Sequence, residues 1–139
     1  MEQTEISAEE WQAYCADFNR AHKGWLVTLA TIATTQLKAA PGPVEALWRV
    51  VADQVRFQEL VLGPVPGSCG IVTQSQTGAA IVEHRLKGLV SLFRLTIDGT
   101  QQGLRIDNAD AGKEQTTLIW LRASSDAQEG LSGSTTVDI

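Results

Sequence analysis

The stretch SAEEWQAYCADFNRAHKGWLVTLATI, Ser7 to Ile32, decides the fold because its periodicity changes from helical to extended part-way along. Apolar residues first recur at intervals of three and four, the spacing of one face of an α-helix: Trp11, Tyr14, Cys15 and Phe18. From residue 25 the chain becomes rich in β-branched residues, which is typical of a strand. We therefore predict a helix that packs its apolar face on a sheet.

Both ends of the predicted helix carry recognisable signals. Ser7 and Glu10 have the spacing of a capping box, in which each side chain accepts a hydrogen bond from a backbone N–H near the helix start. The helix is therefore expected to begin at Ala8. His22 lies in the last turn, where a cation suits the helix dipole, and Gly24 suits the left-handed conformation that ends helices.

The same stretch holds Cys15 and His22, which raises the question of a catalytic dyad. Seven helical residues separate them by about 10.5 Å, whereas a thiolate and an imidazole must approach to about 3 Å to act together. Such a dyad is therefore excluded within this helix. We predict that Cys15 is a buried core residue, and that it and Cys69 are reduced thiols rather than a disulfide.

Most of the remaining chain has the alternation of short strands. After a loop at 39–43, the segment 44–53 allows a helix or a strand, and we predict a strand because Val50 and Val51 are β-branched. Further strands are expected within 55–62, 69–74, 79–86, 93–97, 104–106 and 116–122. The predicted class is α+β, with one N-terminal helix packed on a twisted antiparallel sheet or partly closed β-barrel.

Length and composition indicate one globular domain. The chain has 139 residues and a formal charge of −5, and this acid excess argues against a nucleic-acid partner. The longest nearly apolar run, 25–33, is much shorter than the roughly 20 residues that span a bilayer, and no secretion signal is evident. We expect a cytoplasmic protein with no membrane partner, whose domain covers 6–123 between disordered ends at 1–5 and 124–139.

Both ends of the domain resemble a family of small bacterial proteins known only as a domain of unknown function. The amino end matches the pattern E-x-W…F-x-x-x-H-x-G-W-L-V through Glu9 or Glu10, Trp11, Phe18, His22, Gly24, Trp25, Leu26 and Val27. The carboxy end matches through Leu104, Ile106, Gly112 and the strand around Leu118. Between them, Ala46 and Arg49 stand where the family tends to have proline and glycine. The resemblance implies an architecture and transfers no activity.

Residue types that carry chemistry are few and scattered. The cysteines and histidines lack the paired spacing of a zinc site, and no phosphate-binding glycine motif or catalytic-serine motif occurs. We predict no catalytic residue, metal or cofactor, so an enzyme is the less favoured class. Three carboxylates are expected to cap turns: Asp98, Asp107 and Asp110. His84 is the one candidate for a ligand site, although a strand would turn it away from Glu83 and Arg85.

Two functional hypotheses follow. The first is a non-enzymatic protein-binding or adaptor module, with contacts at Pro64, Val65 and Pro66 of the stiff loop GPVPG and at Trp48 and Arg49. The second is a small-ligand protein or small enzyme with its site near His84 in a barrel mouth. A tryptophan left on an open surface favours the first, and tryptophans around a cavity with His84 favour the second. A homodimer is compatible with either hypothesis.

Overall fold

The computed structural model of the chain describes residues 2–35, 48–63, 67–78, 80–123 and 134–138. Strand β1 (Glu2–Ile6) leads through a 3-10 turn (Ala8–Glu10) into the helix α1 (Trp11–His22). The elements that follow in the described ranges are the strands β2 (Leu26–Ala33), β3 (Arg49–Leu62), β4 (Cys69–Gln74), β5 (Ile81–Leu86), β6 (Leu89–Ile97), β7 (Thr100–Asp110), β8 (Lys113–Ala123) and β9 (Ser134–Asp138).

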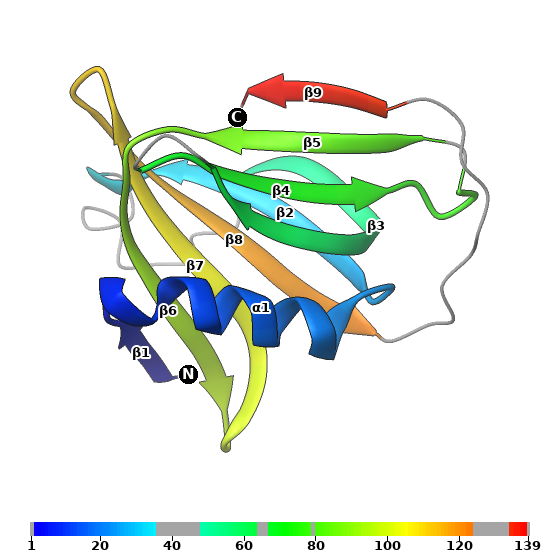
Figure 1. Ribbon diagram of the computed structural model, residues 1–139, viewed down its shortest axis with the longest axis horizontal. Coiled ribbons are helices and arrows are strands. Elements are labelled where there is room, and N and C mark those ends of the chain that lie inside the picture. The colour runs from blue at the N-terminus through cyan, green and yellow to red at the C-terminus, as the bar shows by residue number, and fades with distance from the viewer. Residues whose placement is uncertain (1, 36–47, 64–66, 79, 124–133, 139) are drawn as a thin grey trace.

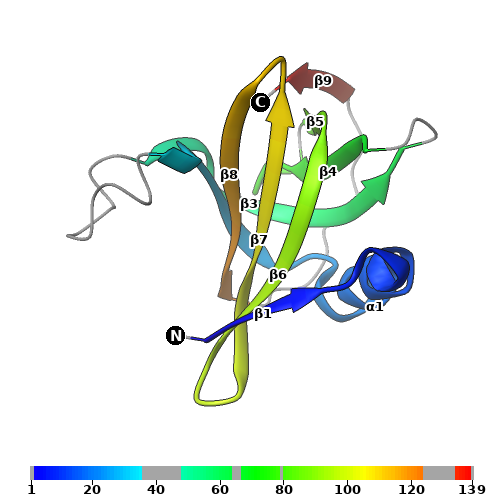
Figure 2. The same ribbon diagram turned by 90° about the vertical axis from the view of Figure 1, so that its left-hand side faces the viewer.

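These strands form one sheet in the order β1-β6-β7-β8-β2-β3-β4-β5-β9. Strands β1 to β8 pair antiparallel, and β9 pairs parallel with β5. The sheet bends so that β3, β4 and β5 stand across the β6-β7-β8 half, with α1 inside the bend (Figures 1 and 2). Within the described residues β1 and β9 do not pair with each other, so the sheet is not closed into a barrel. The predicted helix packed on an antiparallel sheet is confirmed. Of the two predicted alternatives, the described strands form the open sheet and not the partly closed barrel.

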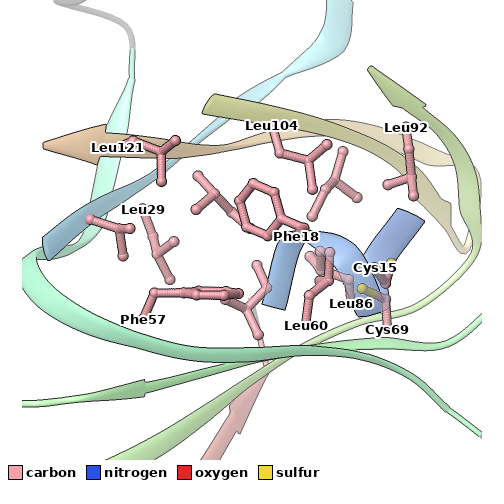
Figure 3. Packing of buried hydrophobic residues seen from close by; sticks show 14 of the residues in the cluster. Cys15, Phe18, Leu29, Phe57, Leu60, Cys69, Leu86, Leu92, Leu104 and Leu121 are labelled. Carbon is pink, nitrogen blue, oxygen red and sulfur yellow. The ribbon is translucent and has the colours of Figure 1, made fainter. Parts of the chain in front are cut away.

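The inner face of the bent sheet and one face of α1 enclose a single hydrophobic core (Figure 3). The ring of Phe18 on α1 meets the ring of Phe57 on β3 edge to face, with 5.2 Å between centroids. Leucines from five strands are almost fully buried around these rings: Leu29, Leu60, Leu86, Leu92 and Leu104. Each such side chain stabilises the fold by roughly 1.5–3 kcal/mol relative to exposure.

Helix α1 is clamped to β3 by hydrogen bonds at two points. The Asn19 side chain bonds both backbone groups of Leu60, because its Oδ1 accepts from the N–H at 2.7 Å and its Nδ2 donates to the carbonyl at 3.0 Å. After the helix, the Gly24 N–H donates to the Phe57 carbonyl at 2.7 Å, and the Phe57 N–H donates to the Trp25 carbonyl at 2.8 Å. The helix and the turn that follows it are therefore both fixed against the same strand.

The start of the helix differs from the prediction. The Ser7 side chain makes no capping hydrogen bond, so the predicted capping box is absent and the prediction was wrong. Instead the Ser7 carbonyl accepts from the Glu10 N–H at 2.9 Å, which tightens the first turn into a 3-10 turn, and the α-helix begins at Trp11. The predicted end is confirmed, since Gly24 has the left-handed φ of 88°.

Both chain ends contain strands where disorder is predicted. Strand β1 pairs with β6 from Glu2 opposite Thr96 to Ile6 opposite Leu92, and Ile6 joins the core. Its other residues are exposed, so their polar pattern resembles a disordered end even though backbone pairing orders them. At the other end Ser134–Asp138 pairs with β5, while the rest of the predicted tail lies outside the described residues.

Strand β3 joins two segments that the sequence suggests are separate. The strand prediction for 44–53 is confirmed from Arg49 onward, and residues 44–47 lie outside the described residues. Irregular register interrupts the pairing of β3 with β2 and with β4, and Gln54 has a positive φ of 50°. Such irregularities bend a strand, which lets β3 pass from one half of the sheet to the other.

The clamp at Asn19 generates a stability prediction. Replacing Asn19 by Ala leaves the N–H and carbonyl of Leu60 without their partner and should lower the free energy of unfolding by about 1–3 kcal/mol, measured by urea denaturation. The control is Gln12→Ala, an exposed site on the same helix, which should change stability by less than about 0.5 kcal/mol. Equal effects of the two substitutions would show that the clamp contributes nothing.

Candidate functional site

His84 lies on β5 with its side chain in the interior, 4% exposed. Its Nε2 is 3.2 Å from the Thr73 hydroxyl, and its Nδ1 is buried without a hydrogen-bond partner. Burial lowers the pKa of His84, so its imidazole is neutral at pH 7. Glu83 and Arg85 bond each other at 3.0 Å and do not reach His84. The structure thus assembles no acid and base pair around this histidine within the described residues.

The residues predicted to bind a partner are divided between the two ends of β3. Residues 64–66 lie outside the described residues, and their neighbours Gly63 and Gly67 mark the connection between β3 and β4. Trp48 is half-buried and Arg49 is exposed at the opposite end of β3, a strand of 14 residues. The two predicted contact regions therefore mark separate ends of one strand.

The four tryptophans divide into two pairs. Trp11 and Trp25 pack against the core, and the Trp11 indole N–H donates to the Ile6 carbonyl at 2.9 Å. Trp48 and Trp120 are half-buried and belong neither to the core cluster nor to the residues packed on it. Two large aromatic side chains therefore lie away from the core.

The register of the β1-β6-β7-β8-β2 half explains where Trp120 lies. Directly paired residues that face the core form one row: Ile6, Leu92, Ile106, Thr117 and Thr31. Two rows point the opposite way, and we call them the outer face: Val50, Ala30, Leu118, Arg105, Phe93 and Glu5 in one, and Thr28, Trp120, Gly103, Leu95 and Gln3 in the other. Side chains alternate along each strand, so these two rows share one side of the sheet.

The centre of the outer face is apolar and partly open to solvent. Leu118, Phe93 and Trp120 are half-buried, and Val50 is 58% exposed. Gly103, directly opposite Trp120, has no room for a side chain, since a Cβ there would lie 2.5 Å from a backbone carbonyl of β8. The small residue leaves the indole without a bulky cross-strand neighbour on β7.

A chain of hydrogen bonds crosses the outer face from Thr34, which directly follows β2, to β1. Arg105 donates through Nε and Nη2 to the two carboxylate oxygens of Asp107, each at 2.9 Å. The Thr116 hydroxyl donates to the same carboxylate at 3.0 Å and lies 3.0 Å from the Thr34 hydroxyl. Arg105 Nη1 donates to the Gln3 side chain at 2.8 Å. The network thus ties the edge strand β1 to β7 and β8 and to Thr34, which directly follows β2.

The ion pair in this network is largely shielded from water. The side chains of Arg105 and Asp107 are 16% and 18% exposed, and the Arg105 guanidinium lies 4.9 Å above the ring of Phe93. Bidentate, shielded pairs of this kind are stronger than exposed ones. Sequence reasoning missed the pair, because Asp107 was expected to cap a turn, whereas it lies within β7 two residues from Arg105 and on the same face.

Two cavities open along the described residues. The first, of about 300 Å³, lies at one corner of the outer face and is lined by Thr34, Val90, Arg105, Asp107, Asn108 and Glu114; we call it the corner cavity. The second, of about 500 Å³, runs over Gly70 between Val61 and Glu83, beside the connection between β3 and β4. Of the two, the corner cavity adjoins the shielded ion pair.

Both cysteines are free, as predicted, and both are buried, which the sequence predicted for Cys15 alone. Burial raises the pKa of Cys15 to about 11 and that of Cys69 to about 12, so both remain thiols at neutral pH. His22 differs from the prediction of a cationic helix end: its Nδ1 is 3.0 Å from the Phe18 carbonyl, and burial lowers its pKa. None of these groups is prepared for nucleophilic or acid–base chemistry.

In the part of the chain that the structure describes, no three His, Cys, Asp or Glu side chains are grouped to hold a metal ion. None of the described helices has the length and apolar character to cross a membrane. Neither a protein-family model, nor a curated protein, nor a solved structure matches the chain. The resemblance to the bacterial family therefore stays a prediction.

The buried histidines generate a pH prediction. The pKa values of His84 and His22 are lowered in the folded protein, so the unfolded chain binds protons first as the pH falls below about 6.5. The free energy of unfolding should therefore fall between about pH 7.5 and pH 5.5. His84→Gln should show a smaller fall in urea denaturation, with the remainder due to His22. An identical fall in the variant would contradict the role of His84.

The shielded ion pair generates a second prediction. Asp107→Asn removes the charge that faces Arg105 and should lower the free energy of unfolding by about 1–3 kcal/mol. Asp17→Asn is a matched control, because Asp17 pairs with Arg20 on α1 and both side chains are more than half exposed; its effect should stay below about 1 kcal/mol. Urea denaturation of both variants measures the difference, and equal midpoints would contradict the distinction.

Proposed function

We propose that this protein is a non-enzymatic protein-binding module and that it binds its partner through the outer face. The observation that carries the proposal is the group of partly exposed apolar residues at the centre of the outer face, on the side of the sheet opposite the core. Trp120, Phe93 and Leu118 are half-buried there and take no part in the core cluster. Aromatic residues and arginine dominate the binding energy of protein interfaces, and the outer face contains Arg105 beside Phe93.

The charges around the outer face favour a partner with basic residues. The chain carries a formal charge of −5, and Arg105 is neutralised by Asp107. Glu5 lies on the outer face at its β1 edge. At the opposite edge, Asp53 of β3 accepts a hydrogen bond from Thr28 of β2 at 2.7 Å. The outer face therefore has an apolar centre with acidic residues at its edges. Such a surface is complementary to a partner surface whose apolar patch is surrounded by Lys and Arg.

The partner contacts predicted from the sequence add two further regions to this proposal. Trp48 lies two positions before Val50, so we place it at the β3 side of the same surface. Arg49 pairs with Thr31, which lies on the other side of the sheet, so it remains a separate proposed contact. Residues 64–66 of the GPVPG loop remain a separate proposed contact. We place the protein in the cytoplasm. Association of two copies through the outer face would give a homodimer, which the experiment below distinguishes from binding to another protein.

A small-ligand protein or small enzyme with its site near His84 is the second candidate. The observation that favours it is the buried Nδ1 of His84, which has no hydrogen-bond partner. A ligand that donates to or accepts from this nitrogen would satisfy it. The binding module is preferred because the described carboxylates do not reach His84.

The proposal is tested with two valine-to-glutamate variants on the same strand. Val50→Glu puts a charge on the outer face, and Val61→Glu makes the same change 11 positions along β3, where the valine is 37% exposed beside the second cavity. Each variant and the natural chain would be used as bait in a native lysate, with quantitative mass spectrometry. We expect a specific partner that Val50→Glu loses at least tenfold and that Val61→Glu retains.

Circular dichroism and size-exclusion chromatography serve as controls for folding and for self-association. Loss of a homodimer in Val50→Glu, with no other protein captured, would assign the outer face to self-association. A partner that Val50→Glu retains in full and Val61→Glu loses would contradict the proposal and point to the surface beside the GPVPG loop.

A further inference from the structure

We propose that the second cavity binds a small organic carboxylate, which is supplied by a free molecule or by an acidic side chain of another protein. The site does not depend on the proposed function, because it lies on the β3-β4-β5 half of the sheet (Figure 1). Direct pairing places Val61, Gly70 and Arg85 in one row of the cavity wall. This row faces away from the core, because the paired residues next to it, Cys69 and Leu86, point into the core.

Gly70 forms the floor of the cavity, and the backbone does not require a glycine there. Gly70 lacks the positive φ found at other described glycines, and the register between β4 and β5 is regular. The three atoms nearest to a Cβ built on Gly70 all belong to the Glu83 side chain, at 3.4 Å or more, which is ordinary contact. At Gly103, by contrast, a Cβ would lie 2.5 Å from a backbone carbonyl. A glycine that weakens a strand without such a reason marks a place where a ligand approaches closely.

Arg85 leaves one edge of its guanidinium open beside this floor. Its Nε donates to Glu83 Oε1 at 3.0 Å, and the side chain makes no other hydrogen bond or ion pair with the described residues. The Nη1 and Nη2 groups therefore remain for a bidentate contact with a carboxylate. Arg105 differs, because Asp107 already occupies two of its nitrogens. The Arg85 and Glu83 side chains are 58% and 38% exposed, so their pair is weak and does not block a ligand.

The charges of the wall select a singly charged anion. Lys87 is exposed and its ammonium group forms no ion pair with the described residues. The two cations, Arg85 and Lys87, and the one anion, Glu83, leave a net charge of +1 on the wall, although the chain carries −5. The Glu83 carboxylate beside the floor repels the second charge of a phosphate dianion. Val61 is 37% exposed, where it can pack on the apolar tail of a carboxylate.

A carboxylate of the chain itself is the competing occupant. Asp138 of β9 lies directly opposite Arg85 in the parallel pairing with β5. If the chain fills the cavity from this position, the natural protein will not bind an added carboxylate and the Asp138→Asn variant will. The proposal instead predicts saturable binding by the natural protein. Binding by the Asp138→Asn variant alone would overturn the proposal.

The test is an NMR titration of the ¹⁵N-labelled protein that follows the backbone amide of Gly70 and the Nε–H of Arg85. The probes are sodium butyrate and n-butanol, which share a chain length and differ in charge, and inorganic phosphate. We expect saturable shifts with butyrate, none with butanol and weaker binding of phosphate. Absence of saturable shifts with butyrate, or the same shifts with butanol, would overturn the proposal. Tighter binding of phosphate than of butyrate would overturn the carboxylate assignment.

Two arginine variants test the charged contact. Arg85→Gln should weaken butyrate binding about fivefold or more, because it removes the bidentate donor. Arg20→Gln is the matched control, because it removes the same charge from another exposed ion pair, that of Arg20 with Asp17 on α1. It should leave the affinity within about twofold. Equal weakening in the two variants would overturn the proposal.

A substitution on the floor tests occupancy of the cavity without changing a charge. Gly70→Val should fill the floor and abolish the butyrate shifts, with circular dichroism and the urea midpoint as checks of folding. Gly70→Ala places a smaller group at an ordinary contact distance and should weaken binding if the valine variant does not fold. Full affinity in a folded floor variant would overturn the proposal.

The source of the carboxylate is tested with two peptide mimics. A protein source predicts that Nα-acetyl-glutamate methylamide binds at least as tightly as butyrate and that the corresponding glutamine derivative does not bind. Binding of butyrate without binding of the glutamate derivative would reject the protein source and assign the site to a free carboxylate.

Discussion

The clamp between α1 and β3 is the constraint on which the rest of the structure depends. Asn19 bonds both backbone groups of Leu60, and Phe18 meets Phe57 edge to face, so the helix lies inside the bend of the sheet. The inner face is thereby filled by the core. On the opposite side, the outer face carries half-buried apolar residues of the described strands. The helix does not cover this face, because α1 lies on the other side of the sheet (Figure 2).

The outer face combines these apolar residues with a network of charged and polar residues that holds the edge strand β1 in place. Strand β1 buries little beyond Ile6, so backbone pairing and the bond from Arg105 to Gln3 contribute most to its position. Shielding an ion pair from water opposes its attraction. The hydrogen bond that Thr116 donates to Asp107 and the one that Arg105 donates to Gln3 offset that desolvation. The same shielding leaves a surface whose centre is apolar and whose remaining charge is negative, which suits a basic protein partner.

Local periodicity was enough to predict α1, its end at Gly24, most strands and the burial of Cys15. The capping box failed because sequence spacing does not determine whether the Ser7 hydroxyl or its carbonyl bonds the first turn. Strand β1 was missed because pairing rather than burial orders its polar residues. The outer face and its network depend on the register between strands distant in sequence, such as Gln3 and Arg105, and a single sequence does not reveal that register.

The most direct test of the central claim is a methyl cross-saturation NMR experiment on the complex with the captured partner. Saturation transferred from the partner reports which methyl groups of this chain lie in the interface. The account predicts strong transfer to Val50, Ala30 and Leu118 on the outer face and little to Val61, which lies beside the second cavity. Strong transfer to Val61 with none to Leu118 would contradict the account and place the binding surface on the β3-β4-β5 half.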